Sequence, residues 1–180
     1  MYGLVNKAIE GLVIKNHGED TWEKIKAAAN VDFDLFVSNE SYDDAVTYNL
    51  VTAASEVLAA PADQILEAFG QYWITDVASE SYGYMMNAAG TTLSEFMQSL
   101  PNFHTRVAMI FPNLRPPRFE IADLEANGLK LHYHSHRPGL QPFVVGLMKG
   151  LGQRYGNDVA VELLESVTTD PVHDIFQVTW

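Results

Sequence analysis

The spacing of apolar residues changes after the segment NLRPP, which ends at Pro117, and this change constrains the fold more than any other feature. Before it, apolar residues recur every three or four positions, as in Leu4, Val5, Ile9 and Leu12, a pattern typical of amphipathic helices. After it, RFEIADL and LKLHYHS alternate apolar and polar residues as paired strands do, and EANG joins them. A helix over GLQPFVVGLMKGLGQRYG and two strands, DVAVELLESV and DIFQVTW, complete the predicted order.

This order, helices and then strand, strand, helix, strand, strand, predicts an α+β fold. We expect a mostly helical N-terminal lobe followed by a C-terminal lobe in which a four-stranded antiparallel sheet carries packed helices. Thr92 and Glu95 form a capping box, and Pro101 is expected to open a separate short helix over NFHTRVAMIF. No repeat or linker divides the 180 residues, so a single domain is expected.

Composition disfavours several classes of partner. The formal net charge is −12 and no basic cluster offsets it, so binding to nucleic acid or to an anionic membrane surface is disfavoured. The chain has no cysteine, which excludes disulfides, thiolate metal ligands and a cysteine nucleophile. Its start carries Lys7, Glu10 and Lys15 and has the character of neither a signal peptide nor a membrane span. We therefore expect a cytoplasmic protein.

The segment KLHYHSHRPG contains three of the six histidines, at a spacing of two. Because side chains alternate along a strand, the segment would have two chemically different faces. One face carries three imidazoles, those of His132, His134 and His136. The other carries a phenol, a hydroxyl and a guanidinium, those of Tyr133, Ser135 and Arg137. The chemistry of the segment depends on which face points inward.

The imidazole face suggests a small metalloenzyme with zinc or non-heme iron, since histidine nitrogens bind both metals. However, His132 and His136 would lie about 13 Å apart on a regular strand, so one ion cannot take both unless the strand curls. Ligands from elsewhere would be needed, and a solvated strand face is the simpler interpretation. The opposite face suits an anion with two carboxylates, because all three groups donate hydrogen bonds. An ordinary polar strand edge is the simpler interpretation there.

His104 is a second candidate ligand. It lies in LPNFHTRVAMIF and shares a helical face with Leu100, Ala108 and Phe111. A lone histidine in such a place is usually a core residue bonded to a backbone carbonyl, although it can also be a ligand. No dinucleotide fingerprint, phosphate loop or Gly-x-Ser-x-Gly elbow is present, and no nucleophile and base are paired. An acidic interaction module without a cofactor, in which His104 and Tyr133 are structural, is therefore also open.

Three features together resemble the H-NOX family, the heme nitric oxide/oxygen-binding domains related to the heme domain of soluble guanylate cyclase. They are His104 on its helix, Pro117 thirteen residues later, and the triplet of Tyr133, Ser135 and Arg137. The resemblance covers essentially the whole chain. It implies one domain over 1–180, with a helical lobe over about 1–60, a heme-binding α/β lobe over about 61–180, and the heme between them.

The resemblance implies a role for each matching residue. His104 would be the axial ligand of the ferrous iron of heme b (iron protoporphyrin IX), which would be five-coordinate with the opposite position open. Tyr133, Ser135 and Arg137 would bind the two propionates, so that the histidines of the segment face outward. Pro117 would press on the porphyrin and bend it out of plane, helped by the stiff backbone at Pro116.

Residues expected on the opposite, distal side indicate which gas binds. Oxygen-binding members of the family have a tyrosine nine residues after the first residue of the triplet, where this chain has Pro142, which has no donor. The nearby Phe143 and Leu147 are apolar. Bound oxygen carries partial negative charge, and a donor stabilises it by ~1–3 kcal/mol. We therefore expect binding of NO and CO and discrimination against oxygen, with the indole of Trp73 tuning affinity.

The resemblance further implies a sensor with no enzymatic activity of its own. NO would weaken the bond from the iron to His104, and release of the helix carrying that residue, together with a flatter heme, would shift the two lobes. The shift would change a surface that a partner protein reads. The family suggests a histidine kinase or a diguanylate cyclase as that partner.

Overall fold

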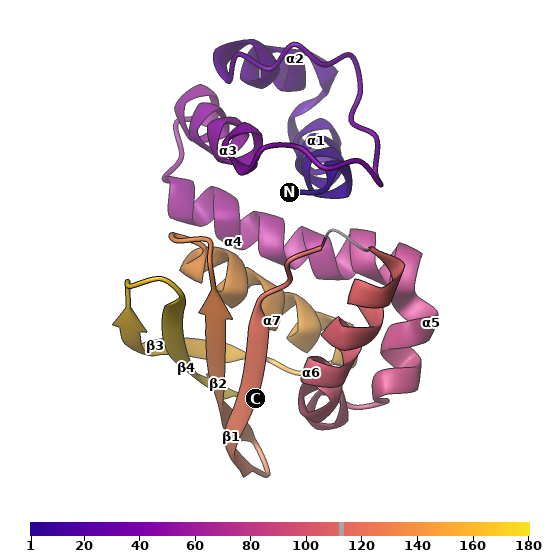
Figure 1. The fold of residues 1–180 in the computed structure, drawn as a ribbon, viewed down its shortest axis with the longest axis vertical. Helices are drawn as coiled ribbons and strands as arrows, with labels where there is room; N and C mark the ends of the chain where they lie inside the picture. The colour runs from indigo at the N-terminus through magenta and orange to yellow at the C-terminus, as the bar shows by residue number, and fades with distance from the viewer. Residues whose placement is uncertain (112–113) are drawn as a thin grey trace.

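The structure, a computed structural model, describes residues 1–111 and 114–180 and confirms the α+β fold. Its elements are α1 (Gly3–His17), α2 (Glu19–Ala28), α3 (Asp44–Leu58), α4 (Ala62–Tyr72), the π-helix η1 (Trp73–Ala78), α5 (Ser79–Ala89), α6 (Leu93–Ile110), β1 (Arg118–Glu125), β2 (Gly128–Ser135), α7 (Gln141–Tyr155), β3 (Ala160–Val167) and β4 (Val172–Thr179) (Figure 1). Within the described ranges, no helix is both long and apolar enough to cross a membrane.

The four strands form one antiparallel sheet in the order β1-β2-β4-β3. Along β2 and β4, buried residues alternate with more exposed ones, so the sheet has one inner and one outer face. The inner face contributes Leu131 and Phe176 to a core that also contains Phe96 of α6 and Met148 of α7. Helices α6 and α7 therefore cover the inner face of the sheet.

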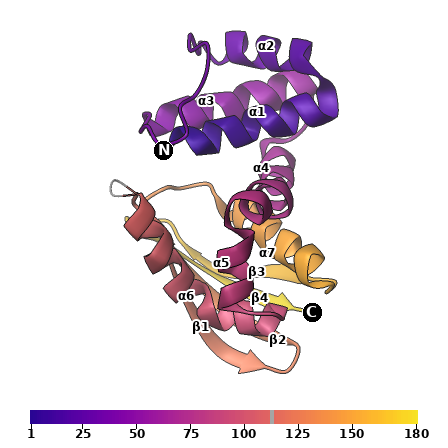
Figure 2. The ribbon, with the colours of Figure 1, turned by 90° about the vertical axis from the view of Figure 1, so that its right-hand side faces the viewer.

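The helices α1 to α3 form a second layer above α4, with a core of their own (Figures 1 and 2). This second core contains Ile25 of α2 and Leu50 of α3, and it includes Phe69 of α4. Trp73, at the junction of α4 and η1, packs against both cores. The run from α4 to η1 is thus the connection between the helical layer and the sheet.

Helices α4 and α7 approach each other so closely that glycine is required at the contact. A Cβ atom at Gly146 of α7 would overlap the carbonyl oxygen of Glu67, and one at Gly70 of α4 would overlap that of Phe143. Beside this contact, Lys149 and Glu67 form an ion pair. The close approach holds the N-terminal half of α7 against α4.

Helix α6 is longer than the sequence analysis expects. The predicted capping box is confirmed, because the Thr92 hydroxyl accepts from the Glu95 amide at 3.3 Å and the Glu95 carboxylate accepts from the Thr92 amide at 3.2 Å. The predicted break at Pro101 is wrong, because one helix runs through it from Leu93 to Ile110. Proline has a helix-compatible φ, but it removes one hydrogen bond and its ring crowds the carbonyl four residues earlier; burial of the α6 face up to Leu100 offsets that cost.

Candidate cofactor site

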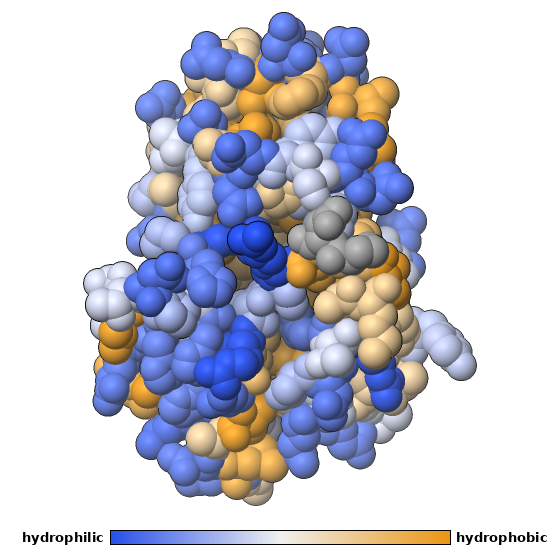
Figure 3. Space-filling model, in the orientation of Figure 1, coloured by the Kyte–Doolittle hydropathy of each residue, from blue (hydrophilic) through white to orange (hydrophobic). Residues whose placement is uncertain are grey.

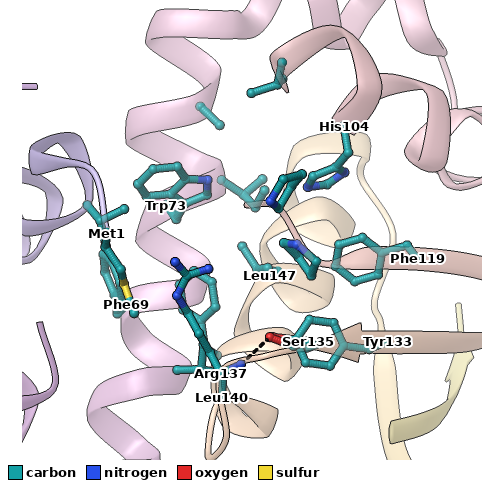
Figure 4. A pocket seen from close by; sticks show the side chains of 18 of the residues that line it. Met1, Phe69, Trp73, His104, Phe119, Tyr133, Ser135, Arg137, Leu140 and Leu147 are labelled. Atoms are coloured by element: carbon teal, nitrogen blue, oxygen red, sulfur yellow. Dashed lines mark hydrogen bonds between the residues drawn. The ribbon is translucent and has the colours of Figure 1, made fainter. Parts of the chain in front are cut away.

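A cavity of about 480 Å³ lies between the helical layer and the sheet (Figure 4). Its size is within the ~300–1,000 Å³ range of ligand and cofactor sites. Most of its lining side chains are aliphatic or aromatic. Every residue that the sequence analysis assigned to the site lines this one cavity: Trp73, His104, Pro117, Tyr133, Ser135, Arg137, Phe143 and Leu147. Pro142 does not line it.

His104 extends from α6 into the cavity, with one ring nitrogen engaged and the other available (Figure 4). Nδ1 lies 3.2 Å from the carbonyl oxygen of Leu100, one turn earlier. A carbonyl oxygen only accepts, so this contact assigns the proton of the neutral ring to Nδ1 and leaves a lone pair on Nε2. No described residue bonds Nε2. Burial lowers the pKa of His104 against the raising effect of the carbonyl bond, which favours the neutral ring that binds metals.

A row of rings connects His104 to the sheet. The His104 ring lies 5.0 Å from the ring of Phe119 on β1, which in turn lies 5.4 Å from the ring of Tyr133 on β2. Both Phe119 and Tyr133 are buried. Burial raises the pKa of the Tyr133 phenol, so it stays a neutral hydrogen-bond donor. Three neighbouring elements thus form one continuous wall of the cavity.

Tyr133 and Ser135 lie on the inner face of β2, and the alternation predicted for this strand is observed. Ser135 is 5% exposed, and its hydroxyl accepts from the Arg137 amide at 3.0 Å (Figure 4). Arg137 follows directly after the strand and lines the same cavity. A phenol, a hydroxyl and a guanidinium therefore meet at one end of an otherwise apolar space, where they can donate to carboxylates.

The guanidinium of Arg137 binds Asp44 of α3, a contact that the sequence analysis missed. Nε lies 2.7 Å from Oδ2 of Asp44, Nη2 lies 3.3 Å from Oδ1, and Nη1 lies 3.0 Å from the carbonyl oxygen of Arg115. The amino group of Met1 lies 2.6 Å from the same carboxylate. Burial by itself raises the pKa of Asp44, but the bonds and charges of Arg137 and Met1 outweigh it and lower that pKa. Because guanidinium has five N–H donors, two remain for another anion.

The remaining wall is built from η1 and α7. Phe69 packs between Trp73 and Phe143, with ring centroids 6.2 Å and 5.0 Å away. Three phenols that the sequence analysis did not identify, those of Tyr2, Tyr48 and Tyr82, also line the cavity. The Tyr48 hydroxyl donates to the carbonyl of Pro138 at 3.0 Å, whereas that of Tyr82 has no hydrogen-bond partner among the described residues. None of these three tyrosines lies in a recognisable motif, which is why only the structure reveals them.

The histidines of β2 lie on the outer face, away from the cavity, and contact His173 of β4. Nδ1 of His132 is 3.0 Å from Nε2 of His173, and the ring of His134 stacks on that of His173 with centroids 4.1 Å apart. His136 instead pairs with the exposed Asp170 at 2.7 Å. In the ranges that the structure describes, no three histidine, aspartate or glutamate side chains are placed to hold a metal ion. A metalloenzyme centred on these histidines is therefore not supported.

The cavity residues fit a flat, apolar cofactor that carries a metal and two carboxylates. The walls are apolar, an imidazole with a free Nε2 enters from α6, and hydrogen-bond donors gather where Tyr133 and Ser135 lie. The adjacent Pro116 and Pro117 line the cavity where the chain enters β1. Such a donor set matches an iron porphyrin better than a purely organic or purely anionic ligand.

Comparisons with known proteins agree with this arrangement. A family model described as Haem-NO-binding matches residues 2–163. Soluble guanylate cyclase gcy-31 of Caenorhabditis elegans is 28% identical over 166 residues, which cover 92% of this chain and 24% of that protein. Soluble guanylate cyclase gcy-35 of the same organism is 31% identical over 172 residues, which cover 92% of this chain and 25% of that protein. The chain thus spans about a quarter of the length of these curated relatives.

Solved structures share the fold. An H-NOX protein from K. algicida, in the Fe(II) unliganded state, superposes with a TM-score of 0.85 at 22% identity, covering 99% of this chain and 96% of that one. An H-NOX protein from S. oneidensis, in the Fe(II)NO ligation state, superposes with a TM-score of 0.86 at 19% identity, covering 99% and 98%. At these identities the likeness shows a common fold over the full length of both chains.

Proposed function

Because the chain belongs to the Haem-NO-binding (H-NOX) family, we propose that it is a sensor domain that holds heme b in the large cavity and responds to NO and CO. The heme would supply the ferrous iron at which the gas binds. The observation that carries the proposal is the state of His104, a neutral imidazole whose Nδ1 is held by Leu100 and whose Nε2 is free within the cavity. Among the described residues, no other histidine lines the cavity.

We assign His104 as the iron ligand, since the bond from Nδ1 to the Leu100 carbonyl fixes the ring and makes Nε2 more basic. Tyr133, Ser135 and the two free N–H groups of Arg137 would hold the propionates by charge-assisted hydrogen bonds. Pro117, with Pro116 before it, would press a rigid ring against the porphyrin. All these residues line the cavity, which supports the assignment.

We propose that the protein discriminates against oxygen because it has Pro142 where oxygen-binding relatives have a tyrosine. Proline has no hydroxyl or amide donor that could stabilise bound oxygen. Phe143 and Leu147 add an apolar wall on α7. The indole of Trp73 is the donor that the sequence analysis placed in the distal pocket, and we propose that it tunes gas affinity. The phenol of Tyr82 joins it as a second donor to be tested in the same way.

Signalling would begin at α6. His104 would tether α6 to the bound heme, and if NO weakened that tether, the helical layer would shift relative to the sheet. The ion pair between Arg137 and Asp44 crosses between these two parts, so it would move with them. The partner would be a histidine kinase or a diguanylate cyclase in the cytoplasm. Neither nucleic acid nor a membrane is expected as a partner, given the net charge of −12.

Absorption spectra of the purified protein test the proposal. Protein produced with a heme precursor should show a Soret band, and the ferrous band should move on adding NO or CO and remain unchanged in air apart from slow oxidation. A colourless protein would contradict the proposal, as would one that binds zinc or non-heme iron in place of heme. A ferrous protein that forms a lasting oxygen complex in air would contradict the proposed discrimination alone.

A further inference from the structure

The run from α4 through η1 to α5 forms much of the cavity wall. Its lining residues are Leu66, Phe69, Trp73, Ile74, Ala78, Tyr82 and Met86, which recur every four positions from Ile74 onward. In an α-helix, successive residues are ~100° apart around the axis. Side chains four residues apart therefore point in directions that differ by ~40°, and this rotation accumulates along the helix. A continuous α-helix would therefore carry the later residues away from the cavity. The π-helix adds an extra residue to the turn and offsets this drift.

Side-chain hydrogen bonds hold the π-helical turn at its end. The amide and the hydroxyl of Ser79 both donate to the carbonyl of Ile74, the hydroxyl at 2.6 Å. Bonding from one residue to the carbonyl five residues earlier is the pattern that distinguishes a π-turn from an α-turn. Ser79 thus duplicates with its side chain the backbone bond that defines the turn.

Arg154 of α7 reinforces this contact from outside the run. Its Nη1 donates to the Ser79 hydroxyl oxygen at 2.6 Å, and its Nη2 donates to Oδ1 of Asn87 at 2.8 Å. Among the described residues, no carboxylate lies within ion-pair distance of Arg154, and its buried Nε has no partner. Its charge is therefore directed at neutral acceptors on α5. A cationic donor polarises the Ser79 hydroxyl and strengthens the bond that this hydroxyl gives to Ile74.

We propose that Arg154 and Ser79 are positioning residues that fix the π-turn, and through it the wall made by Trp73 and Ile74, and so set how a diatomic gas is held. Neither Arg154 nor Ser79 lines the cavity, so both act through the turn. This inference rests on the proposed function, because the gas site is the one that the wall would shape. If the inference is right, loosening the π-turn changes the surroundings of the bound gas even though every residue that lines the cavity is kept.

Three variants and a matched control test the inference on the heme-loaded protein. Ser79→Ala and Arg154→Gln should shift the C–O stretching frequency of the ferrous CO complex and speed amide hydrogen exchange in Trp73–Ser79 by about fivefold, as expected for one lost hydrogen bond. Arg154→Lys, which keeps the charge, should recover part of both changes. Asn87→Ala removes a different acceptor of Arg154 and should leave both readouts unchanged.

Combining Ser79→Ala with Arg154→Gln should add little to either single change, because both residues act in one chain of bonds. Unchanged C–O stretching and exchange in folded Ser79→Ala and Arg154→Gln proteins would overturn the inference. Equal changes in Asn87→Ala would also overturn it, since they would show a general loosening of α5. A parent protein that takes up no heme would instead contradict the proposed function, and the exchange measurement would still decide whether Arg154 holds the turn.

Discussion

His104 illustrates how one contact can fit two interpretations of a residue. The apolar helical face around it predicts a core histidine bonded to a backbone carbonyl, and that bond, from Nδ1 to Leu100, is present. The same bond leaves Nε2 free within the cavity, so the structural contact also orients the ring for a ligand role. Periodicity alone cannot separate the two interpretations, because the cavity is formed by elements distant in sequence. The family resemblance was needed to favour one of them.

Substituting Pro142 tests the argument about oxygen. Pro142 does not itself line the cavity, but its neighbours Leu140 and Phe143 do, so we expect the longer side chain of a tyrosine at 142 to bring a phenol to the cavity. Pro142→Tyr should lengthen the life of the ferrous oxygen complex by about tenfold or more, because a hydrogen bond to a charged acceptor contributes ~1.5–3 kcal/mol. Stopped-flow absorption measures this lifetime. Pro142→Phe is the control, and an equal gain in that variant would show that the hydroxyl is not the cause.

The strands and helices differ in how far their local sequence predicts them. The alternation in LKLHYHS predicts β2 and its buried face correctly, since packing and local pattern agree there. Pro101 predicts a helix break that does not occur, because tertiary packing on α6 overrides the local preference. The π-turn at Trp73–Ala78 was not predicted, since the spacing of apolar residues does not report the backbone bond from Ser79 to Ile74 that defines it, and Arg154, which contacts Ser79, lies on α7.

Gly146 tests the close contact between α4 and α7. In Gly146→Ala the new Cβ would overlap the carbonyl oxygen of Glu67, so the helices must separate. The free energy of unfolding, measured by urea denaturation, should fall by about 1–3 kcal/mol. Gly83→Ala is the control, because its new Cβ would meet only Nη2 of Arg154 at 3.8 Å. Equal losses in the two variants would mean that the helices do not meet as described.

The outer face of the sheet should make stability depend on pH. Burial lowers the pKa of His134, and the charges of His173, Arg118 and His132 lower it further. Since its folded pKa is below the unfolded value of 6.5, the unfolded chain gains the proton first as the solution is acidified. The stability that His134 contributes is therefore present above about pH 6.5 and is lost as pH falls toward the folded pKa.

His134→Gln should weaken this dependence. The variant should lose less free energy of unfolding than the parent between about pH 7 and about pH 5.5, because glutamine does not titrate in this interval. Urea denaturation at the two pH values measures the difference. His17→Gln, on the exposed end of α1, is the control and should retain the dependence of the parent. A parent and a His134→Gln protein with the same pH dependence would contradict the account of the histidine cluster.

The arrangement of the whole chain, two layers with a cavity between them, depends on contacts that join residues far apart in sequence. Asp44 and Arg137 are 93 positions apart, and the only local feature of Asp44 is its place at the start of a helix. The residues that the sequence analysis assigned to the site came from a family resemblance, which carries such long-range information. Asp44, Tyr48 and Tyr82 lie outside the matched motifs, so they were not predicted.

Asp44→Asn tests the contact between the layers. Removing the carboxylate leaves Arg137 and the Met1 amino group without their shared partner, and the free energy of unfolding at neutral pH should fall by ~1 kcal/mol, as for a partly exposed ion pair. Because the folded pKa of Asp44 is lowered, the contribution is present above about pH 3.8 and is lost on further acidification. Urea denaturation measures the change. Asp32→Asn, at an exposed loop position, should have no effect, and an equal loss there would contradict the prediction.

Resonance Raman spectroscopy of the ferrous protein tests the assignment of His104 most directly. The parent should show an iron–histidine stretching band, His104→Gly should lack it, and added imidazole should restore an equivalent band by entering the space left by the side chain. A His104→Gly protein that keeps the band and the absorption spectrum of the parent without imidazole would contradict the assignment, because another group would then hold the iron.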